Sequence, residues 1–485
     1  MTEVTRTTPL ASSPSLLDAV IPVAALIILL GASYAFYGDK AAQGPNQIAL
    51  VFCALIAAGI AAKNGLAWSA LRAAVVDGVS TGLSAIFILL AVGALIGTWA
   101  LSGTIVTMVY YGLQVLSPHY FYASSALICG VVAVGIGSSW TVAGTIGIGL
   151  IGVANNMGLS PAITAGAVIS GAYFGDKASP LSDTVNLATA AAGSDLFAHI
   201  RKSLVTSVPA LALAIICFAL LGKPSDFDAS KLIASLAQHF TVTPWSLLPI
   251  VLVFGLAVVR FPPFVTIFAG ALFGGVLAVV LNARQTIAFA QSQSLPAPLA
   301  AIKGVWSALA NGYLSNSGDA QIDVLLSRGG MESMLNTVWL ILTALAFGAV
   351  LEHAGLLNRL IAPVVSKIRS TGGIFVAVVA SCIGVNIIAS DQYIAVVLPA
   401  RMFRVEFDRR KLPTVALSRA VGDSGSVTSP LIPWNSCGAY MAAALGVPTF
   451  AYAGFAFFCL FNPLATIVVA LLEFRATTST RSATS

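Results

Sequence analysis

The feature that most constrains this chain is a series of apolar runs, each at least about as long as a membrane-spanning helix. A helix needs about 20 mostly apolar residues to cross the hydrocarbon core of a bilayer. Several runs are longer than one crossing requires or contain Gly and Pro, so we expect an all-α polytopic membrane protein with about 11–13 membrane segments. The runs lie near 16–37, 46–62, 75–101, 120–151, 203–221, 246–281, 334–351, 371–400 and 448–472.

The composition excludes the soluble classes of protein. Hydrophobic residues make up 58% of the 485 residues and charged residues only 9%, whereas soluble domains carry roughly 25% charged residues. So few charges cannot cover the surface of a soluble globule of this size. Cytosolic enzymes, nucleic-acid binders and disordered proteins are therefore excluded, and the lipid bilayer is the expected surrounding. The net charge of +6 is expected to set membrane orientation through basic loops.

Motifs for cofactors and catalysis are missing from the sequence. No Walker A motif occurs, so ATP is not the expected energy source. The six cysteines stand singly in apolar runs without ligand spacing, as packing residues do. Glu352 and His353 do not complete an H-E-x-x-H zinc motif, and His119, His199 and His239 lie at segment ends, where we expect interfacial positions. The sequence therefore predicts no cofactor and no enzyme activity.

Polar interruptions occur at 222–245 and 282–333, and the second, longer one separates the chain into two apolar halves. The expected parts are a polar N-terminal tail at 1–15, N-terminal transmembrane helices at 16–72, a first repeat at 73–221, connecting helices and a polar loop at 222–333, a second repeat at 334–472 and a C-terminal tail at 473–485.

Three motifs recur in the two halves in the same order, about 250 positions apart. Internal repeats are typical of secondary transporters and are often inverted in the bilayer. We therefore expect two structural repeats with broken helices at their interface. The matched stretches are Leu89 to Gly103 with Leu342 to Gly355, 134–141 with 383–391, and Gly175-Asp176 with Ser179-Pro180-Leu181 against Gly422-Asp423 with Ser429-Pro430-Leu431.

The basic residues favour inversion of these repeats. The stretch 401–411 holds five Lys and Arg residues, and its counterpart at 152–160 holds no charge. Lys and Arg favour the cytoplasmic side, so the two loops are expected to face opposite sides. Arg359, Lys367 and Arg369 make the other end of the same segment basic, so the absolute orientation stays open.

Four aspartates stand in apolar or helix-breaking surroundings, two in each half. Ionisable groups at membrane depth cost about 2.5 kcal/mol or more and are functional by default. In the first half, the stretch 171–186 combines Gly171, Gly175 and Pro180 with side-chain oxygens, which predicts an unwound segment that can ligate a cation. The alternative is a polar loop in which Asp176 pairs with Lys177. The candidate ion-binding residues are Asp176, Ser179, Asp183, Thr184 and Asn186.

The second half repeats this chemistry within 422–435 and the preceding apolar run. Asp391 has a second interpretation, as the N-cap of a helix, a position that Asp fills well; it could also do both. The candidate ion-binding residues here are Asn386, Asp391, Asp423, Ser429 and Asn435. The expected Na⁺ ligands are drawn from both halves: Asp183, Asn186, Asp391 and Asp423.

Four stretches resemble the NhaC-type Na⁺/H⁺ antiporters. They are Gly137-Ser-Ser-Trp-Thr-Val-Ala-Gly-Thr-Ile-Gly147, Asp391-Gln-Tyr-Ile-Ala-Val-Val-Leu-Pro399, Ser429-Pro-Leu-Ile-Pro-Trp-Asn435 and the residues 170–187. The resemblance runs from about residue 80 to 470. It implies cation/proton exchange in the inner membrane of a bacterium, with Na⁺ and H⁺ as the transported ions. Some similar proteins exchange organic acids, such as malate for lactate, so the resemblance leaves the substrate open.

The expected mechanism is exchange of Na⁺ for H⁺ by alternating access, with the ions competing for buried Asp carboxylates. The alternative is a Na⁺- and H⁺-coupled exchanger of a small organic acid or an amino acid. In that case Lys177 or Arg419 could hold the carboxylate of the substrate. The oligomeric state stays open, with a homodimer as one option.

Overall fold

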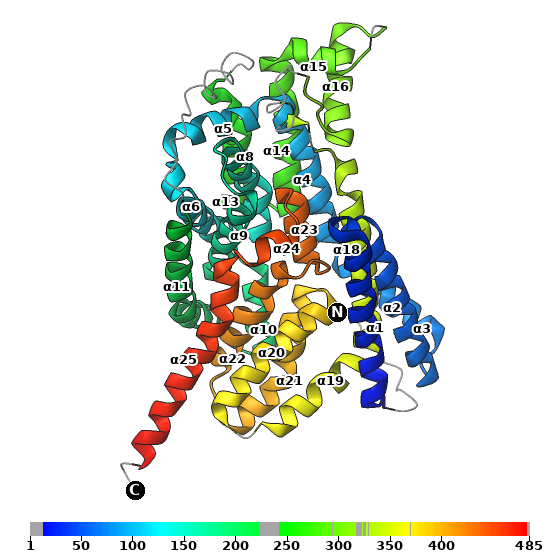
Figure 1. Cartoon of the computed structure of the whole chain (residues 1–485), viewed down its shortest axis with the longest axis vertical. Helices are drawn as coiled ribbons and strands as arrows, with labels where there is room; N and C mark the ends of the chain where they lie inside the picture. Colours follow the sequence, from blue (N-terminus) through cyan, green and yellow to red (C-terminus); the bar gives the residue numbers. More distant parts are fainter. Residues whose placement is uncertain are drawn as a thin grey trace.

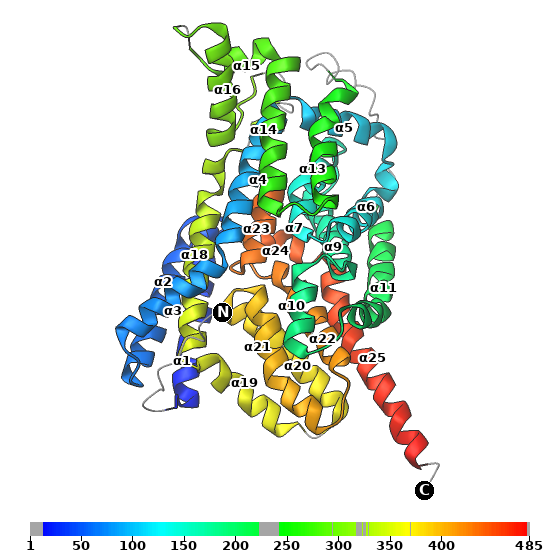
Figure 2. The same cartoon turned by 180° about the vertical axis from the view of Figure 1, so that it is seen from behind.

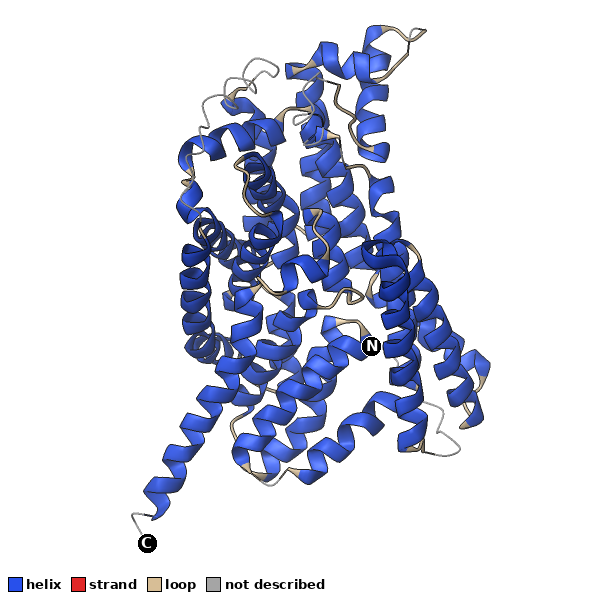
Figure 3. Cartoon of the chain, viewed as in Figure 1, coloured by secondary structure: helices blue, strands red, loops and turns tan. Residues whose placement is uncertain are grey.

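The computed structural model describes residues 13–222, 242–292, 294–316, 323, 326–327, 329–368 and 370–482. Within these ranges the fold is helical and no β-strand occurs (Figure 3). Two short π-helical turns, Ala143–Gly147 and Gly422–Ser426, interrupt the α-helices.

The helices up to the first gap in the description are α1 (Leu16–Tyr37), α2 (Pro45–Lys63), α3 (Trp68–Thr81), α4 (Leu83–Leu101), α5 (Thr104–Val115), α6 (Phe121–Ile136), α7 (Ser139–Val142), α8 (Ile148–Asn156), α9 (Pro161–Ala178), α10 (Asp183–Ala192) and α11 (Leu196–Leu221). Those that follow are α13 (Leu248–Val258), α14 (Pro263–Leu281), α15 (Ala283–Phe289), α16 (Ala297–Asn311), α18 (Leu335–His353), α19 (Leu356–Lys367), α20 (Thr371–Ala389), α21 (Gln392–Arg409), α22 (Thr414–Val421), α23 (Ser436–Leu445), α24 (Thr449–Ala453) and α25 (Phe457–Ser482).

Eight helices among the described residues are long and apolar enough to cross a membrane, judged by length and composition. They include α1, α2, α4, α6, α11, α14, α18 and α20. The prediction of an all-α polytopic membrane protein is therefore confirmed. Four further apolar helices have only 10–17 residues, so the expected count of 11–13 membrane segments stays a prediction.

The helices form an elongated bundle. Helices α1, α2 and α3 lie along one flank, and α6 and α11 lie along the opposite flank (Figures 1 and 2). Helices α5, α8, α15 and α16 gather toward one end, and α19 to α22 gather toward the other. The C-terminal part of α25 projects beyond the bundle.

Besides the run at 448–472, which holds the separate helices α24 and α25, four of the long apolar runs are divided into helical segments, at Gly82, Gly137, Arg260 and Ser390. The last three residues have positive φ angles of 74°, 69° and 60°. This left-handed conformation ends a helix and redirects the chain, and it is costly for residues other than glycine. The expected broken helices are thus present at defined points of the chain.

The break within 171–186 lies later than its glycines suggest. Helix α9 continues through Gly171 and Gly175 to Ala178, and the chain leaves the helix only at 179–182. The expectation that these glycines unwind the helix is therefore wrong. They instead let α9 approach α6 closely, because a Cβ atom at Gly171 would meet the Ala126 carbonyl oxygen. Small residues serve this purpose in membrane helices.

Gly171→Leu is expected to destabilise the protein by about 1–3 kcal/mol or more, because the side chain would overpack a backbone contact that cannot move aside. The measurement is the melting temperature of the detergent-solubilised protein, followed by size-exclusion chromatography with fluorescence detection. Gly135→Leu on α6 is the matched control, because a Cβ atom there meets nothing within 4 Å. Equal melting temperatures for the two variants would contradict this account of the α6–α9 contact.

Candidate ion-binding pocket

The helix breaks meet at one cavity of about 510 Å³. Residues at or next to the breaks at Gly82, Gly137, 179–182, Arg260 and Ser390 line it: Gly82, Gly137, Pro180, Arg260 and Asp391. Broken helices expose backbone groups and end charges that a continuous helix would hide. The sequence-predicted residues that line the cavity are Asp176, Asp183, Asn186 and Asp391.

Asp176 lies in the last turn of α9 and accepts two hydrogen bonds from the start of α7. The backbone N–H and the hydroxyl of Ser139 donate to its Oδ2 atom at 3.3 and 2.7 Å. The other oxygen, Oδ1, is buried and has no hydrogen-bond partner within the described residues. A buried carboxylate oxygen without a donor is costly, and it is well suited to bind a proton or a cation.

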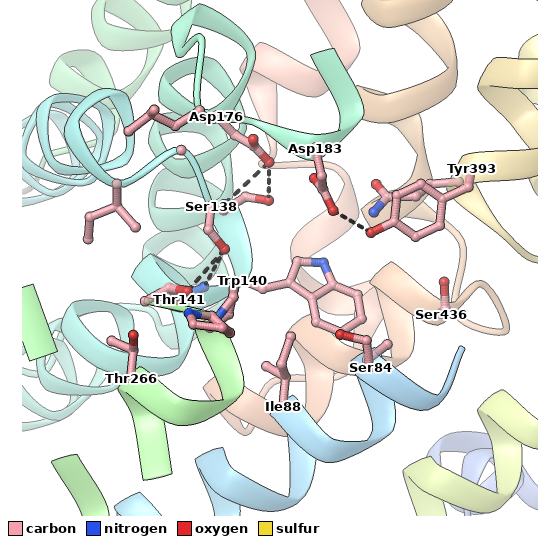
Figure 4. Close-up of a pocket in the computed structure, with 18 of the residues that line it drawn as sticks. Ser84, Ile88, Ser138, Trp140, Thr141, Asp176, Asp183, Thr266, Tyr393 and Ser436 are labelled. Carbon is pink, nitrogen blue, oxygen red and sulfur yellow. Dashed lines mark hydrogen bonds between the residues drawn. The ribbon is translucent and has the colours of Figure 1, made fainter. Parts of the chain in front are cut away.

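Asp183 is the first residue of α10, and it is exposed to the pocket. Its Oδ1 atom accepts the N–H of Thr184 at 2.7 Å, and its Oδ2 atom accepts the hydroxyl of Tyr393 at 2.6 Å. Figure 4 shows Asp183 and Tyr393 facing each other, with the indole of Trp140 beside them. This bond joins the break after α9 to the break before α21.

Trp140 forms a wall of the pocket. Its ring stacks on Tyr440 with centroids 4.0 Å apart and planes inclined by 14°. Its buried Nε1 atom has no hydrogen-bond partner among the described residues. The wall thus carries a hydrogen-bond donor that no described residue uses.

Asp391 is the N-cap of α21 and also lines the pocket. Its Oδ1 atom accepts the N–H groups of Tyr393 and Ile394 at 2.8 and 3.0 Å. No described residue donates a hydrogen bond to its Oδ2 atom. The N-cap interpretation of the sequence is therefore confirmed, and it leaves one oxygen for an ion.

Of the remaining predicted residues of the first half, Asn186 lines the pocket, and Ser179 and Thr184 support the break behind it. The amide nitrogen of Asn186 donates to the Ser182 carbonyl oxygen at 2.7 Å, which leaves its own oxygen for a ligand. The Ser179 hydroxyl accepts the N–H of Leu181 at 3.2 Å. Thr184 bonds the Ser182 hydroxyl at 3.0 Å. The structure thus places Ser179 and Thr184 behind the pocket surface.

Three predicted residues of the second half form a buried network behind Asp391. Asn386 donates to the Gly425 carbonyl oxygen at 2.6 Å, and Asn435 donates to the Asn386 side-chain oxygen at 3.1 Å. Ser429 donates to Gln392 at 3.4 Å. These residues hold the break between α22 and α23, and none of the three lines the pocket.

Asp423 lies apart from the other three aspartates. It does not line the pocket, and it is fully buried against α11 and α25. Its ion-pair partner is Lys177. The alternative pairing of Lys177 with Asp176 does not occur. Asp183 and Asp391 line the pocket and Asp423 does not, so the expected common site of these three residues is wrong.

Several residues at the two sites were missed by sequence reasoning. Tyr393 and Trp140 stand within the motifs that carry the family resemblance, but an aromatic residue in an apolar run gives no local signal for a pocket. Arg260 lies in a turn, Arg260-Phe-Pro-Pro263, inside the apolar run 246–281, which the sequence assigns to the connecting region at 222–333. His199 was expected at the interface, but it is buried and hydrogen-bonds to Ser418 at 2.9 Å.

Comparison with known proteins identifies the family. The model of the "Na+/H+ antiporter family" matches residues 171–474, a range that contains all four aspartates. The chain belongs to the Na⁺/H⁺ antiporter family. The resemblance to NhaC-type antiporters is thereby confirmed.

Curated members of the antiporter family match most of the chain. The Na⁺/H⁺ antiporter NhaC of Alkalihalophilus pseudofirmus is 37% identical over 88% of this chain and 90% of its own length. The NhaC protein of Bacillus subtilis is 35% identical over 84% and 88%. A malate-2H⁺/Na⁺-lactate antiporter of Bacillus subtilis is 34% identical over 91% of each chain. All three relatives are antiporters, so the expected class of membrane transporter is confirmed.

Proposed function

We propose that this chain exchanges Na⁺ for H⁺ across the membrane and that the ions compete for Asp176, Asp183 and Asp391. The observation that carries this proposal is the convergence of three carboxylates on one cavity formed by helix breaks. Each carboxylate has an oxygen that is unpartnered or open to the pocket. Three carboxylates without a bound cation repel one another, so they favour binding of either H⁺ or Na⁺.

The pocket supplies the oxygen ligands that Na⁺ requires. Asp183, Asp391 and Asn186 offer side-chain oxygens, with Asp176 as a further carboxylate. A bound Na⁺ favours the ionised carboxylates and so releases protons, whereas protonation removes the charge that holds Na⁺. Neighbouring carboxyl groups of this kind titrate together, so the proton belongs to the group of residues.

The division into two repeats is part of the proposal. Corresponding helix ends recur 252 or 253 positions apart in the two halves. Glycines in the left-handed conformation precede α5 and α19 and follow α10 and α23. Side chains that cap the helix N-terminus precede α7 and α21, and also α10 and α23. The pairs are Gly103 with Gly355, Ser138 with Asp391, Ser182 with Asn435, and Gly193 with Gly446. This constant spacing supports repeats at 73–221 and 334–472.

The same spacing changes one of the motif matches. At 253 positions, Asp176 corresponds to Ser429, and the Asp176–Ser139 contact corresponds to the Ser429–Gln392 contact. Asp176 is therefore not the counterpart of Asp423 in this alignment. Helices α5 and α8 lie toward the end of the bundle opposite α19 and α21 (Figures 1 and 2), as inverted repeats require.

The proposal places the protein in the inner membrane of a bacterium. Alternating access would move one repeat against the other around the pocket. The oligomeric state stays open, with a homodimer as one option.

The proposal is tested in proteoliposomes that hold a pH gradient. Adding NaCl is expected to collapse the gradient, whereas choline chloride is not, and LiCl and KCl give the cation preference. Protein-free liposomes are the control for leakage. Failure of NaCl to collapse the gradient, with or without organic substrates, would contradict exchange by this chain.

A second candidate function is exchange of a small organic acid or amino acid coupled to Na⁺ and H⁺. Arg260 favours this candidate, because it is the one basic residue among the described residues that line the pocket. A basic side chain can hold the carboxylate of a substrate. The cavity also falls within the range of about 300–1,000 Å³ of small-molecule sites. Lys177 and Arg419, which the sequence suggested for this role, do not line the pocket. Gradient collapse only when malate, lactate or an amino acid accompanies Na⁺ would support this candidate.

A further inference from the structure

A group of buried charges lies outside the pocket, between α9, α11, α22 and α25. Lys177 and Asp423 form an ion pair whose side chains are 4% and 0% exposed. Charges are costly to remove from water and, within a membrane, they are rare and mark ion pathways. The cation pocket uses neither of these two charges.

The surroundings of Asp423 fit an ionised carboxylate. Thr206 donates to its Oδ2 atom at 2.8 Å, and Asn462 donates to its Oδ1 atom at 3.1 Å. Thr466 donates a further hydrogen bond to Oδ2, and Lys177 supplies the opposite charge. These donors come from three helices, so the carboxylate is held by the tertiary structure rather than by its own turn.

Further ionisable groups connect this pair to the surface. His199 bonds Ser418, and Arg419 follows Ser418 in sequence. The guanidinium of Arg419 is buried and donates no hydrogen bond within the described residues, although Glu473 lies 3.7 Å away. Glu473 also pairs with Lys202, and these two side chains are 32% and 36% exposed. His199 lies beside Gly422, the neighbour of Asp423, so these polar side chains form a candidate route from Asp423 to water.

The other elements packed against the turn that holds Asp423 add no charge beside it. Helix α20 carries no charged residue. The one charged residue of helix α10 is Asp183, which lies at the pocket. Helix α21 carries its charged residues from Arg401 onward, and Asp391 caps its N-terminus at the pocket. The protonation of Asp423 is therefore governed by Lys177, with His199, Arg419, Lys202 and Glu473 farther along the route.

The last turn of α9 links the two sites. Asp176 and Lys177 are consecutive residues, yet Asp176 contacts Ser139 at the pocket and Lys177 contacts Asp423. A movement of this turn that changes the Asp176 site therefore also displaces Lys177. Without its counter-charge, a carboxylate at this depth is favoured in the protonated form.

We propose that Asp423 is a second proton-binding site of the exchanger, coupled to the cation pocket through Asp176 and Lys177 in the last turn of α9. This inference rests on the proposed Na⁺/H⁺ exchange and assigns one of the transported protons to a site that does not hold Na⁺. When Lys177 leaves as an ammonium ion, a proton enters from water at the Glu473 surface and binds a carboxylate oxygen of Asp423. When Lys177 returns, Asp423 releases the proton to the side of the membrane that is then accessible.

The test measures the number of protons moved per Na⁺ in proteoliposomes. Uptake of radioactive Na⁺ gives the Na⁺ flux, and a pH-sensitive dye inside the vesicles gives the proton flux. The double variant Lys177→Met/Asp423→Asn removes both charges and so leaves neither one buried without its partner. We expect it to exchange with one proton fewer per Na⁺, while the half-saturating Na⁺ concentration stays within about twofold. An unchanged ratio would overturn the proposal and make the pair structural. Absence of Na⁺-driven exchange in the wild type would instead contradict the proposed function. The wild-type vesicles show this outcome independently of the proton count of the variant.

A milder variant tests the same site if the double variant does not fold. Thr466→Val removes one hydrogen bond to the charged carboxylate and conserves the shape of the side chain. We expect the acidic limb of the pH profile of exchange to move to higher pH by roughly half a unit or more, with an unchanged KM for Na⁺ at the optimum. Thr189→Val is the control, because that hydroxyl donates only to backbone carbonyl oxygens. A pH profile that coincides with that of the control would overturn the proposal.

Discussion

Asp183→Asn is expected to reduce Na⁺-driven proton exchange by about 100-fold or more, to the background of protein-free liposomes. An amide neither releases a proton nor carries the charge that attracts Na⁺. Loss of one partner from a charged contact costs about 2–5 kcal/mol, and each 1.4 kcal/mol corresponds to a factor of ten. The measurement is the rate of gradient collapse after addition of NaCl.

The fold of Asp183→Asn is expected to be intact. The side chain faces the pocket. The amide oxygen of Asn can still accept the N–H of Thr184, and its NH₂ group can donate to the hydroxyl oxygen of Tyr393 in place of the bond that this hydroxyl now donates. Asp408→Asn makes the same chemical change at an exposed position that does not line the pocket, and it is expected to exchange like the wild type. Wild-type exchange by correctly folded Asp183→Asn would remove this residue from the mechanism.

Asp391→Asn is expected to abolish exchange while leaving the melting temperature nearly unchanged. Asn is as good an N-cap as Asp, so the hydrogen bonds from Tyr393 and Ile394 that begin α21 persist. Only the charge is lost. Parallel measurement of exchange and of thermal unfolding in detergent separates the two roles of this carboxylate.

Asp391→Ala supplies the comparison, because it removes the cap as well as the charge. It is expected to lose exchange and about 1 kcal/mol of stability. If Asp391→Asn exchanges at the wild-type rate while Asp391→Ala is unstable, then Asp391 is a cap alone, and the pocket works with Asp176 and Asp183.

The sequence predicted the class of fold and much of the pocket because both depend on local composition. Apolar runs of bilayer length require helices in a membrane, and Asp391, with its neighbours Ser390 and Gln392, stands out in such a run. The placement of Asp183 beside a helix break also follows from local features, since Pro180 and Ser182 precede it. Residues of this kind can be recognised one stretch at a time.

The position of Asp423 could not be predicted in this way. Its stretch has the same Gly-Asp and Ser-Pro-Leu elements as that of Asp176. However, α9 ends at Ala178, soon after Asp176, whereas a π-helical turn at Gly422–Ser426 lets the helix continue to Thr428. Its partners Thr206 and Thr466 come from helices remote in sequence. The choice between a pocket and a buried ion pair is made by these tertiary contacts.

The contribution of Arg260 could not be predicted for a different reason. A single basic residue followed by two prolines between apolar runs is typical of an exposed turn. Only the packing of the α13–α14 pair against the other helices brings that turn to the cavity. The sequence does not show how deep in the molecule a turn lies.

Since the helix breaks line the pocket, the residues proposed to bind an ion also lie at the hinge points of the helices. A substitution that strengthens binding of one cation would then also make a helix break more or less flexible. Selectivity and turnover would change together in most pocket variants, and natural relatives would adapt to new salts by paired changes on both sides of a break. Screens for altered cation preference in this chain should therefore combine substitutions across two breaks rather than vary one position at a time.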